Sequence, residues 1–186
     1  MRIGISGAQS VGKTTLLNAL RSEPIFKDYS ICDEVTRRVK SYGLLINEHG
    51  SDVTQRLIMQ EHIVNLFMHD NMITDRTSLD GLVYTKYLRN KGKVSQEILD
   101  LAYRIFNKTV QLYDLLFYIV PEFDIVDDGT RSTDTEFRDD IVQIFNDVMS
   151  GHNINFLFVN GSVRQRTQFI LDIYNTELEK RTNHNG

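Results

Sequence analysis

The chain has 186 residues, of which 41% are hydrophobic and 25% are charged, and its formal net charge is −4. This composition is ordinary for a soluble globular protein, and the negative charge does not support a broad nucleic-acid-binding face, although a local basic groove is compatible with it. Cys32 is the only cysteine, which excludes a disulfide within the chain, and the lack of an apolar run of about 18 residues argues against a membrane-spanning helix. We expect a cytoplasmic single domain over residues 1–180, without a signal peptide or membrane association, and a frayed tail over residues 181–186.

Expected strands and helices alternate along the chain. Short apolar runs predict strands, at residues 2–6, 29–33, 71–75, 115–120 and 154–159. Helical periods and capping patterns predict helices, at residues 13–21, 34–41, 52–69, 78–88, 95–113, 133–150 and 162–178. This alternation favours a parallel sheet with right-handed crossovers and helices on both faces. The predicted fold class is therefore α/β, a three-layer α/β/α sandwich around a five-stranded parallel sheet.

The sequence also predicts which side chains form the core. In the helix expected at residues 52–69, the side chains near a helical period are Val53, Leu57, Ile63, Leu66 and Phe67. Aromatic side chains are most simply core residues as well, among them Phe67, Phe117, Tyr118 and Phe145. Cys32 lies in an apolar run and is expected to be a small core residue.

A phosphate-binding motif follows the first expected strand. Residues 7–15 fit the pattern G-x-x-x-x-G-K-[ST], and they lie between a strand and a helix, as a P-loop requires. Backbone N–H groups of such a loop, together with the helix N-terminus, bind phosphate oxygens. We expect Lys13 to reach the β- and γ-phosphates and the Thr14 hydroxyl to hold Mg²⁺. The predicted nucleotide-binding residues are Gly7, Ala8, Gln9, Ser10, Val11, Gly12, Lys13, Thr14 and Thr15; the alternative is a turn that merely caps a helix.

Charged residues follow the third expected strand directly. Ligands of parallel sheets lie beyond the carboxyl ends of the strands, which is where Asp75 and Arg76 are expected. Asp75 could bind Mg²⁺ through water or act as a base on an attacking hydroxyl. Arg76 could hold an acceptor phosphate or stabilise charge during transfer. The alternative is a turn aspartate beside a surface arginine.

A second charged pair follows the second expected strand. Glu34 could accept a proton from an acceptor hydroxyl, or bond to a base or sugar. Arg37 lies one helical turn further on, so both side chains could face an acceptor. The alternative is an ordinary ion pair on a solvated helix.

Further arginines follow the fourth and fifth expected strands. Arg131 and Arg138 lie in a segment of about residues 122–138 that could close over the donor phosphates as a lid. Many aspartates in that segment could instead pair with them in a solvated loop. Arg164 could stack on adenine after strand five, although capping of the last helix already explains the neighbouring Ser162.

Taken together, these residues resemble P-loop nucleoside and nucleotide kinases, and more closely the NadR-type kinase domain often labelled an AAA-type ATPase. The P-loop, Glu34 with Arg37, Asp75 with Arg76, and Arg131 with Arg138 match that family in order over nearly the whole chain. The resemblance implies a P-loop NTPase fold, ATP and Mg²⁺ as cofactors, and phosphoryl transfer. No adenylyltransferase half accompanies the kinase-like part, so a bifunctional NAD enzyme is not expected.

The resemblance leaves the acceptor open. Thymidylate kinases usually carry Arg-Glu-Pro after the second strand, where this chain has residues 33–35, Asp-Glu-Val. Many deoxynucleoside kinases have Glu-Arg at the third strand, where this chain has Asp75 and Arg76. The sequence also leaves open whether Asp75 or Glu34 binds the metal or acts as the base, and whether the chain forms an oligomer.

Three functions fit the motifs. The first is transfer of the ATP γ-phosphoryl group to a nucleoside or (deoxy)nucleotide. The second is phosphorylation of a hydroxymethylated pyrimidine in DNA, as in phage-type kinases, which needs a groove for a strand and a flipped base and is less consistent with a net charge of −4. The third is an ATP-dependent switch or binding module. A guanine-specific switch is not favoured because Asn107-Lys108-Thr109-Val110 lacks the required aspartate.

Overall fold

The computed structural model describes residues 1–33, 35–122 and 135–184. Its sheet has five parallel strands in the order β2-β3-β1-β4-β5. The strands are β1 (Arg2–Ser6), β2 (Ser30–Cys32), β3 (Met72–Asp75), β4 (Leu115–Ile119) and β5 (Phe156–Val159). The predicted α/β fold class is confirmed.

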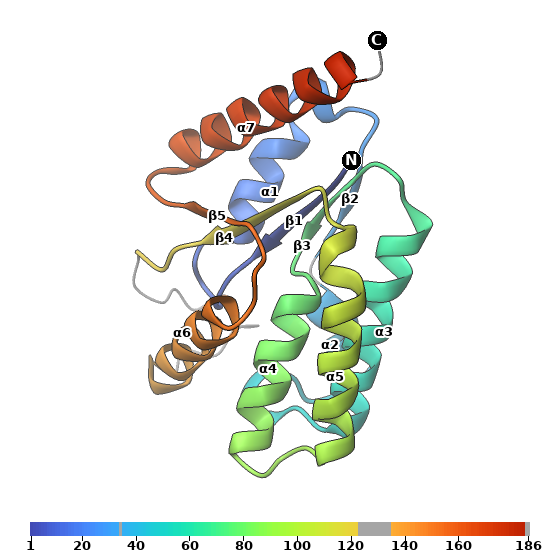
Figure 1. The fold of residues 1–186 in the computed structure, drawn as a ribbon. Coiled ribbons are helices and arrows are strands. Elements are labelled where there is room, and N and C mark those ends of the chain that lie inside the picture. Colours follow the sequence, from blue (N-terminus) through green and yellow to red (C-terminus); the bar gives the residue numbers. More distant parts are fainter. Residues whose placement is uncertain (34, 123–134, 185–186) are drawn as a thin grey trace.

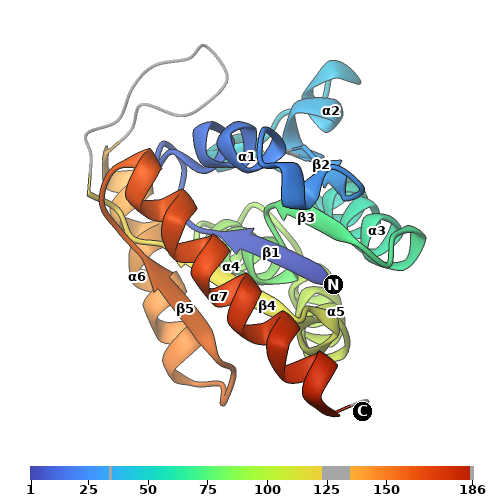
Figure 2. The same ribbon diagram turned by 90° about the horizontal axis from the view of Figure 1, so that it is seen from above.

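The helices cover both faces of this sheet (Figures 1 and 2). One face carries α1 (Lys13–Arg21) and α7 (Val163–His184), which pack on one another. The other face carries α3 (Asp52–Met68), α4 (Ser78–Asn90), α5 (Gln96–Thr109) and α6 (Thr135–Ser150), with α2 (Val35–Ser41) packed on α3. Short 3₁₀ turns, η1 (Pro24–Phe26), η2 (Asn47–His49) and η3 (Val110–Leu112), complete the described elements.

The centre of the sheet brings β1 close to the start of α4. A Cβ atom added at Gly4 would lie 2.5 Å from Thr77 Cγ2 and 2.9 Å from Leu116 Cδ2, so only glycine fits between the strand and the helix. Beyond Gly4, Ser6 Oγ lies 2.7 Å from Thr77 Oγ1 in a buried hydrogen bond. These contacts place the end of β1, where the P-loop begins, directly against the first residues of α4.

The last helix is longer than expected. We predicted an end near residue 178, but α7 continues to His184, so residues 181–184 are helical rather than frayed. Near this end of the helix, the Arg181 side chain donates to Asp114 at 2.6 Å and to Glu177 at 3.0 Å. Neither glycine nor proline interrupts the helix before that point, which is why it continues.

The prediction for the inward face of α3 is confirmed at Leu66, which is buried, and wrong near the two ends of the helix. The side chains of Val53 and Phe67 are 58% and 66% exposed, whereas the buried positions include the polar Gln55 and His62. The other predicted core residues, Phe117, Tyr118, Phe145 and Cys32, are buried, and this burial raises the pKa of the Cys32 thiol. Among the described residues, no helix is both long and apolar enough to cross a membrane.

Candidate active site

The P-loop joins the end of β1 to the start of α1. Three of its residues have positive φ angles: Gly7 at 150°, Ser10 at 60° and Gly12 at 86°. A Cβ at Gly7 would lie 3.0 Å from the Ile119 carbonyl oxygen, and Gly12 forms the N-cap of α1 in the left-handed region. Glycine is therefore required at both ends of the loop, and the turn between them forms a concavity of the kind that binds anions.

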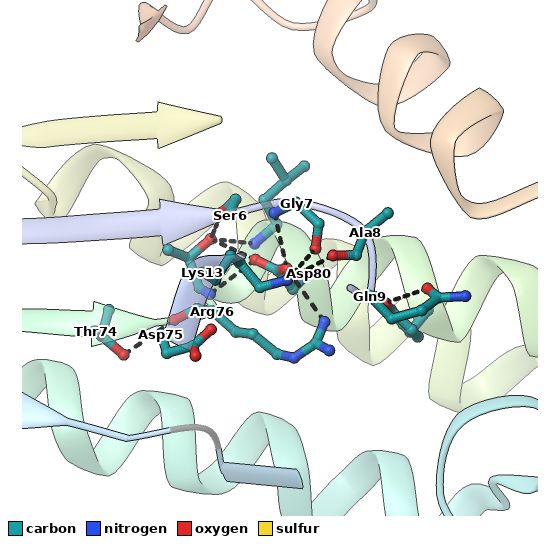
Figure 3. Close-up of polar contacts among 12 residues, drawn as sticks. Ser6, Gly7, Ala8, Gln9, Lys13, Thr74, Asp75, Arg76 and Asp80 are labelled. Carbon is teal, nitrogen blue, oxygen red and sulfur yellow. Dashed lines mark hydrogen bonds and ion pairs between the residues drawn. The ribbon is translucent and has the colours of Figure 1, made fainter. Parts of the chain in front are cut away.

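Lys13 lies inside this loop (Figure 3). Its side chain is buried, and Nζ donates to the carbonyl oxygens of Gly7 at 2.9 Å and Ala8 at 2.6 Å. Two fixed acceptors hold the ammonium group at the loop. The sequence predicts that Lys13 reaches the nucleotide phosphates, and in the structure its ammonium group lies against the carbonyl oxygens of the loop.

Thr14 and Asp75 meet beside the lysine. Thr14 Oγ1 donates to Asp75 Oδ2 at 2.9 Å, and Asp75 is buried at the end of β3, opposite Ile5 of β1. A hydroxyl and a carboxylate oxygen are ligands that suit Mg²⁺, which usually completes its shell with substrate phosphates and water. In the part of the chain that the structure describes, no group of three or more acidic, histidine or cysteine side chains forms a metal cluster. The donor set thus fits a metal ion bound together with a nucleotide.

Asp80 connects the P-loop with the Asp75–Arg76 segment. One oxygen of this buried carboxylate accepts from the Gly7 N–H at 3.3 Å and lies 3.5 Å from Arg76 Nη1. The other accepts from the Thr77 N–H at 2.9 Å. Thr77 and Asp80 also form the capping box of α4. Our sequence reasoning missed Asp80, although its spacing from Thr77 fits a capping-box pattern.

Arg76 is held in a strained backbone conformation. Its φ angle is 82°, a left-handed value that costs a bulky residue about 1–3 kcal/mol. The N–H of Arg76 donates to the Ile5 carbonyl at 2.9 Å, and the carbonyl of Arg76 accepts from Thr74 Oγ1 at 3.0 Å. The guanidinium carbon lies 4.8 Å from the centre of the Tyr84 ring. The Arg76 side chain is buried, so its guanidinium lies in the interior rather than at the surface.

A pocket opens beside the Arg76 guanidinium. Tyr84 lies between it and the P-loop, because the Tyr84 hydroxyl donates to Gln9 Oε1 at 3.0 Å. On the far side, Gln55 of α3 is fixed by Thr85, whose Oγ1 lies 3.0 Å from Gln55 Oε1. The pocket is lined by Thr36, Asn47, Gln55, Ile58, His62, Arg76, Asp80, Gly81 and Tyr84. Its wall thus combines a cation, a carboxylate and amides beside an aromatic ring.

The structure does not describe all of the predicted acceptor and lid residues. Glu34 lies outside the described residues, and so does the part of the proposed lid at residues 123–134, which includes Arg131. Arg37 is exposed on α2, and it is not part of the pocket wall. Arg138 is half-buried in α6, next to Phe137, which packs on Tyr84.

The helix after β5 contributes an arginine other than the one predicted. Arg164 is exposed, whereas Arg166 is buried and donates to the carbonyl oxygen of Val11 in the P-loop at 2.6 Å. It also pairs with Glu122 at 3.0 Å. The Gly161 N–H and then Arg166 lower the pKa of the Glu122 carboxyl. The sequence contains no local signal for the contact with the P-loop, because Val11 lies 155 residues away from Arg166 along the chain.

Comparisons with known proteins agree with the fold. A family model described as an AAA domain matches residues 2–166. Deoxyadenosine kinase from M. mycoides, solved with the products dCMP and dCDP, is similar over 95% of this chain and 99% of its own, with a TM-score of 0.69 and 18% identity. A search of curated proteins finds no matching sequence.

Two further solved structures have the same fold. NadR protein in complex with NR matches 86% of this chain and 45% of its own, with a TM-score of 0.66 and 17% identity. YorR protein from Bacillus subtilis, in complex with phosphorylated GDP, matches 97% of this chain and 98% of its own, with a TM-score of 0.57 and 18% identity. The resemblance to P-loop kinases predicted from the motifs is confirmed.

The Asp80 connection predicts a large loss of stability on its removal. Asp80→Asn removes the charge of the buried carboxylate that lies 3.5 Å from Arg76 Nη1, and breaking a buried ion pair costs about 3 kcal/mol. We expect the urea midpoint of unfolding to fall accordingly. As a control, Asp70→Asn removes an ion pair with Arg2 whose carboxylate is 98% exposed, so its midpoint is expected to stay close to the parent's. Equal midpoints for Asp80→Asn and the parent would contradict the role given to Asp80.

Proposed function

Since the chain belongs to the AAA domain family whose model matches residues 2–166, and has the fold of P-loop kinases, we propose that it transfers the γ-phosphoryl group of ATP to a nucleoside or (deoxy)nucleotide. The observation that carries this proposal is the adjacency of two sites. Asp80 contacts the P-loop backbone at Gly7 and the arginine of the neighbouring pocket, Arg76. A phosphate chain bound at the P-loop and an acceptor bound in the pocket would therefore be only a few side chains apart.

The donor half of the proposal rests on the P-loop. Lys13 would exchange its bonds to the Gly7 and Ala8 carbonyls for contacts with the β- and γ-phosphate oxygens. Thr14 and Asp75 would hold Mg²⁺, Asp75 directly or through water, and the ion would offset charge on the phosphates. Lys13 and the loop N–H groups keep the phosphate chain in one orientation. Positioning and electrostatic stabilisation supply most of the catalysis in such reactions.

The acceptor half of the proposal rests on the Arg76 pocket. An aromatic ring, amide groups and a buried arginine suit a planar, hydrogen-bonding base with a nearby hydroxyl or phosphate. Gln55 is held in place by Thr85, so its amide presents a fixed edge to a bound base. The structural relatives support this class of acceptor, since one is a deoxyadenosine kinase with dCMP and dCDP bound.

The proposed reaction moves the γ-phosphoryl group from ATP to an oxygen of the acceptor. An acceptor oxygen attacks the γ-phosphorus while the bond from that phosphorus to the β–γ bridging oxygen breaks. The electron pair leaves with ADP. A hydroxyl acceptor gives its proton to a carboxylate, either Asp75 or Glu34, whereas a monophosphate acceptor requires no base. Arg76 stabilises the charge that develops on the transferred group.

The proposal is tested by following the γ-phosphate. The protein is incubated with Mg²⁺ and γ-labelled ATP beside a panel of nucleosides, deoxynucleosides, their monophosphates and hydroxymethyluracil-containing DNA. The products are separated by chromatography. We expect label on at least one acceptor, with ADP formed in equal amount. Label on hydroxymethyluracil-containing DNA alone would assign the chain to the DNA-modifying class. Hydrolysis at the same rate with every acceptor would assign it to the switch or binding class.

The pocket predicts a separation of kinetic effects. Gln55→Leu removes the fixed amide while keeping the size of the side chain, and a lost hydrogen bond to a substrate raises KM by about tenfold. We expect that increase in the KM of the acceptor, with the KM of ATP unchanged. Gln60→Leu makes the same change on the exposed face of α3 and is expected to alter neither. An acceptor KM equal to the parent's in Gln55→Leu would remove Gln55 from the acceptor site.

A further inference from the structure

Arg166 is the largest side chain among those that the structure describes as fully buried, and it lies behind the P-loop. We propose that Arg166 is a positioning residue for the donor nucleotide, which fixes one peptide of the P-loop and the turn between β5 and α7 in a single arrangement. This inference rests on the proposed function only in that the P-loop binds a nucleoside triphosphate. It does not depend on the acceptor.

The first contact sets the direction of a P-loop N–H group. Arg166 Nη1 donates to the Val11 carbonyl at 2.6 Å. In a planar trans peptide the C=O and the following N–H point in opposite directions, and the described residues contain no cis peptide. The Val11 carbonyl points back to the guanidinium, so the Gly12 N–H points away from it, to the phosphate side of the loop. The same Nη1 lies 3.5 Å from where a Cβ of Gly12 would be.

The second set of contacts fixes the β5–α7 turn. Arg166 Nε donates to the Gly161 carbonyl at 2.7 Å, and Nη2 lies 3.0 Å from Glu122 Oε2. The same Glu122 oxygen accepts from the Gly161 N–H at 2.6 Å. Both polar groups of the Gly161 backbone are therefore bound to this pair. The turn lies at the carboxyl end of β5, the edge of the sheet where ligands of this fold class bind.

The choice of arginine supports a positioning role. Burying a guanidinium costs free energy that an apolar side chain of similar size would not cost, so stability alone does not explain it. Arginine has donors in a rigid planar fork, and here separate nitrogens contact Val11, Gly161 and Glu122. Lysine has one nitrogen and cannot make these contacts at once in the same geometry. Arg166→Lys thus keeps the charge and loses the geometry.

The test measures donor binding separately from acceptor use. Parent, Arg166→Lys and Glu122→Gln are titrated calorimetrically with Mg·ATP and with Mg·tripolyphosphate, and the KM of the acceptor found in the panel is measured. For Arg166→Lys we expect the Kd of both ligands to rise at least about tenfold, with the acceptor KM unchanged. Glu122→Gln keeps an acceptor oxygen but loses the charge, so a smaller rise in the Kd of Mg·ATP is expected.

Arg181→Lys is the matched control, because it changes an arginine at the other end of α7 that pairs with Asp114 and Glu177. Its Kd values are expected to equal the parent's. An unchanged Kd in folded Arg166→Lys would overturn the proposal, as would a parallel rise in the acceptor KM. If Arg166→Lys does not fold, an unchanged Kd of Mg·ATP in Glu122→Gln overturns it instead. A parent that binds neither ligand would refute the donor site itself, which is a different outcome.

Discussion

Lys13→Ala is expected to lower phosphoryl transfer by about a thousandfold, the upper range for removal of one electrostatic group from a transition state. The physical reason is the position of Lys13. Its buried ammonium is already held within the P-loop by the Gly7 and Ala8 carbonyls, so it needs little rearrangement to reach phosphate oxygens. The charge that develops on the transferred group would have no cation at this point in the variant. Release of ADP in the presence of the acceptor measures the effect.

Folding has to be measured beside turnover in this variant. The Gly7 and Ala8 carbonyls belong to a loop whose shape is also fixed by Asp80 and Arg166, so we expect the circular dichroism spectrum to be unchanged. Lys91→Ala removes another lysine, which follows the last residue of α4 and pairs with Asp140 of α6. This variant is expected to leave turnover unaffected. Turnover of folded Lys13→Ala equal to the parent's would overturn the assignment of the P-loop as the donor site.

Asp75→Asn is expected to reduce kcat by about a hundredfold to a thousandfold. Asp75 is buried at the end of β3 and accepts a hydrogen bond from the Thr14 hydroxyl at 2.9 Å. Asparagine keeps the shape of the side chain but loses the charge and the capacity to take a proton. The measurement is kcat as a function of Mg²⁺ concentration and of pH.

The shape of that dependence separates the two roles left open for Asp75. If it binds Mg²⁺, a higher Mg²⁺ concentration restores part of the lost rate. If it takes the proton of a hydroxyl acceptor, the rate stays low at saturating Mg²⁺ and the acidic limb of the pH profile is lost. Asp114→Asn makes the same change at the opposite end of the sheet, just before β4, and is expected to keep kcat. A kcat of Asp75→Asn equal to the parent's at every Mg²⁺ concentration would contradict both roles.

The P-loop was predictable because its signals are local. A strand, a loop and a helix follow one another within residues 2–21, and the predicted bounds of β1 and α1 agree with the structure. The same holds for Asp75, which is the last residue of β3, and for Arg76, which follows it. In each case neighbouring residues and the rule for strand ends carry the prediction.

The pocket beside Arg76 was not predictable from the hydrophobic pattern. The face of α3 that turns inward carries Gln55 and His62, while Phe67 and Met68 are exposed at 66% and 71%. A search for apolar periodicity overlooks buried positions that carry polar side chains. Such a conflict between pattern and structure is expected where side chains serve binding rather than packing.

The supporting contacts were missed for another reason. Asp80 meets Gly7 across 73 residues, and Arg166 meets Val11 across 155. Only the packing of α4 and α7 against the sheet brings these pairs together. Local sequence patterns contain no information on which of several arginines in a helix will reach the P-loop.

The most direct test of the whole account is a calorimetric titration of the folded protein with Mg·ATP. Because the P-loop, Lys13 and Thr14 lie together at the end of β1, we predict saturable heat at a single site per chain, which disappears in Lys13→Ala. A folded parent that gives no saturable heat with Mg·ATP or Mg·GTP would contradict the account.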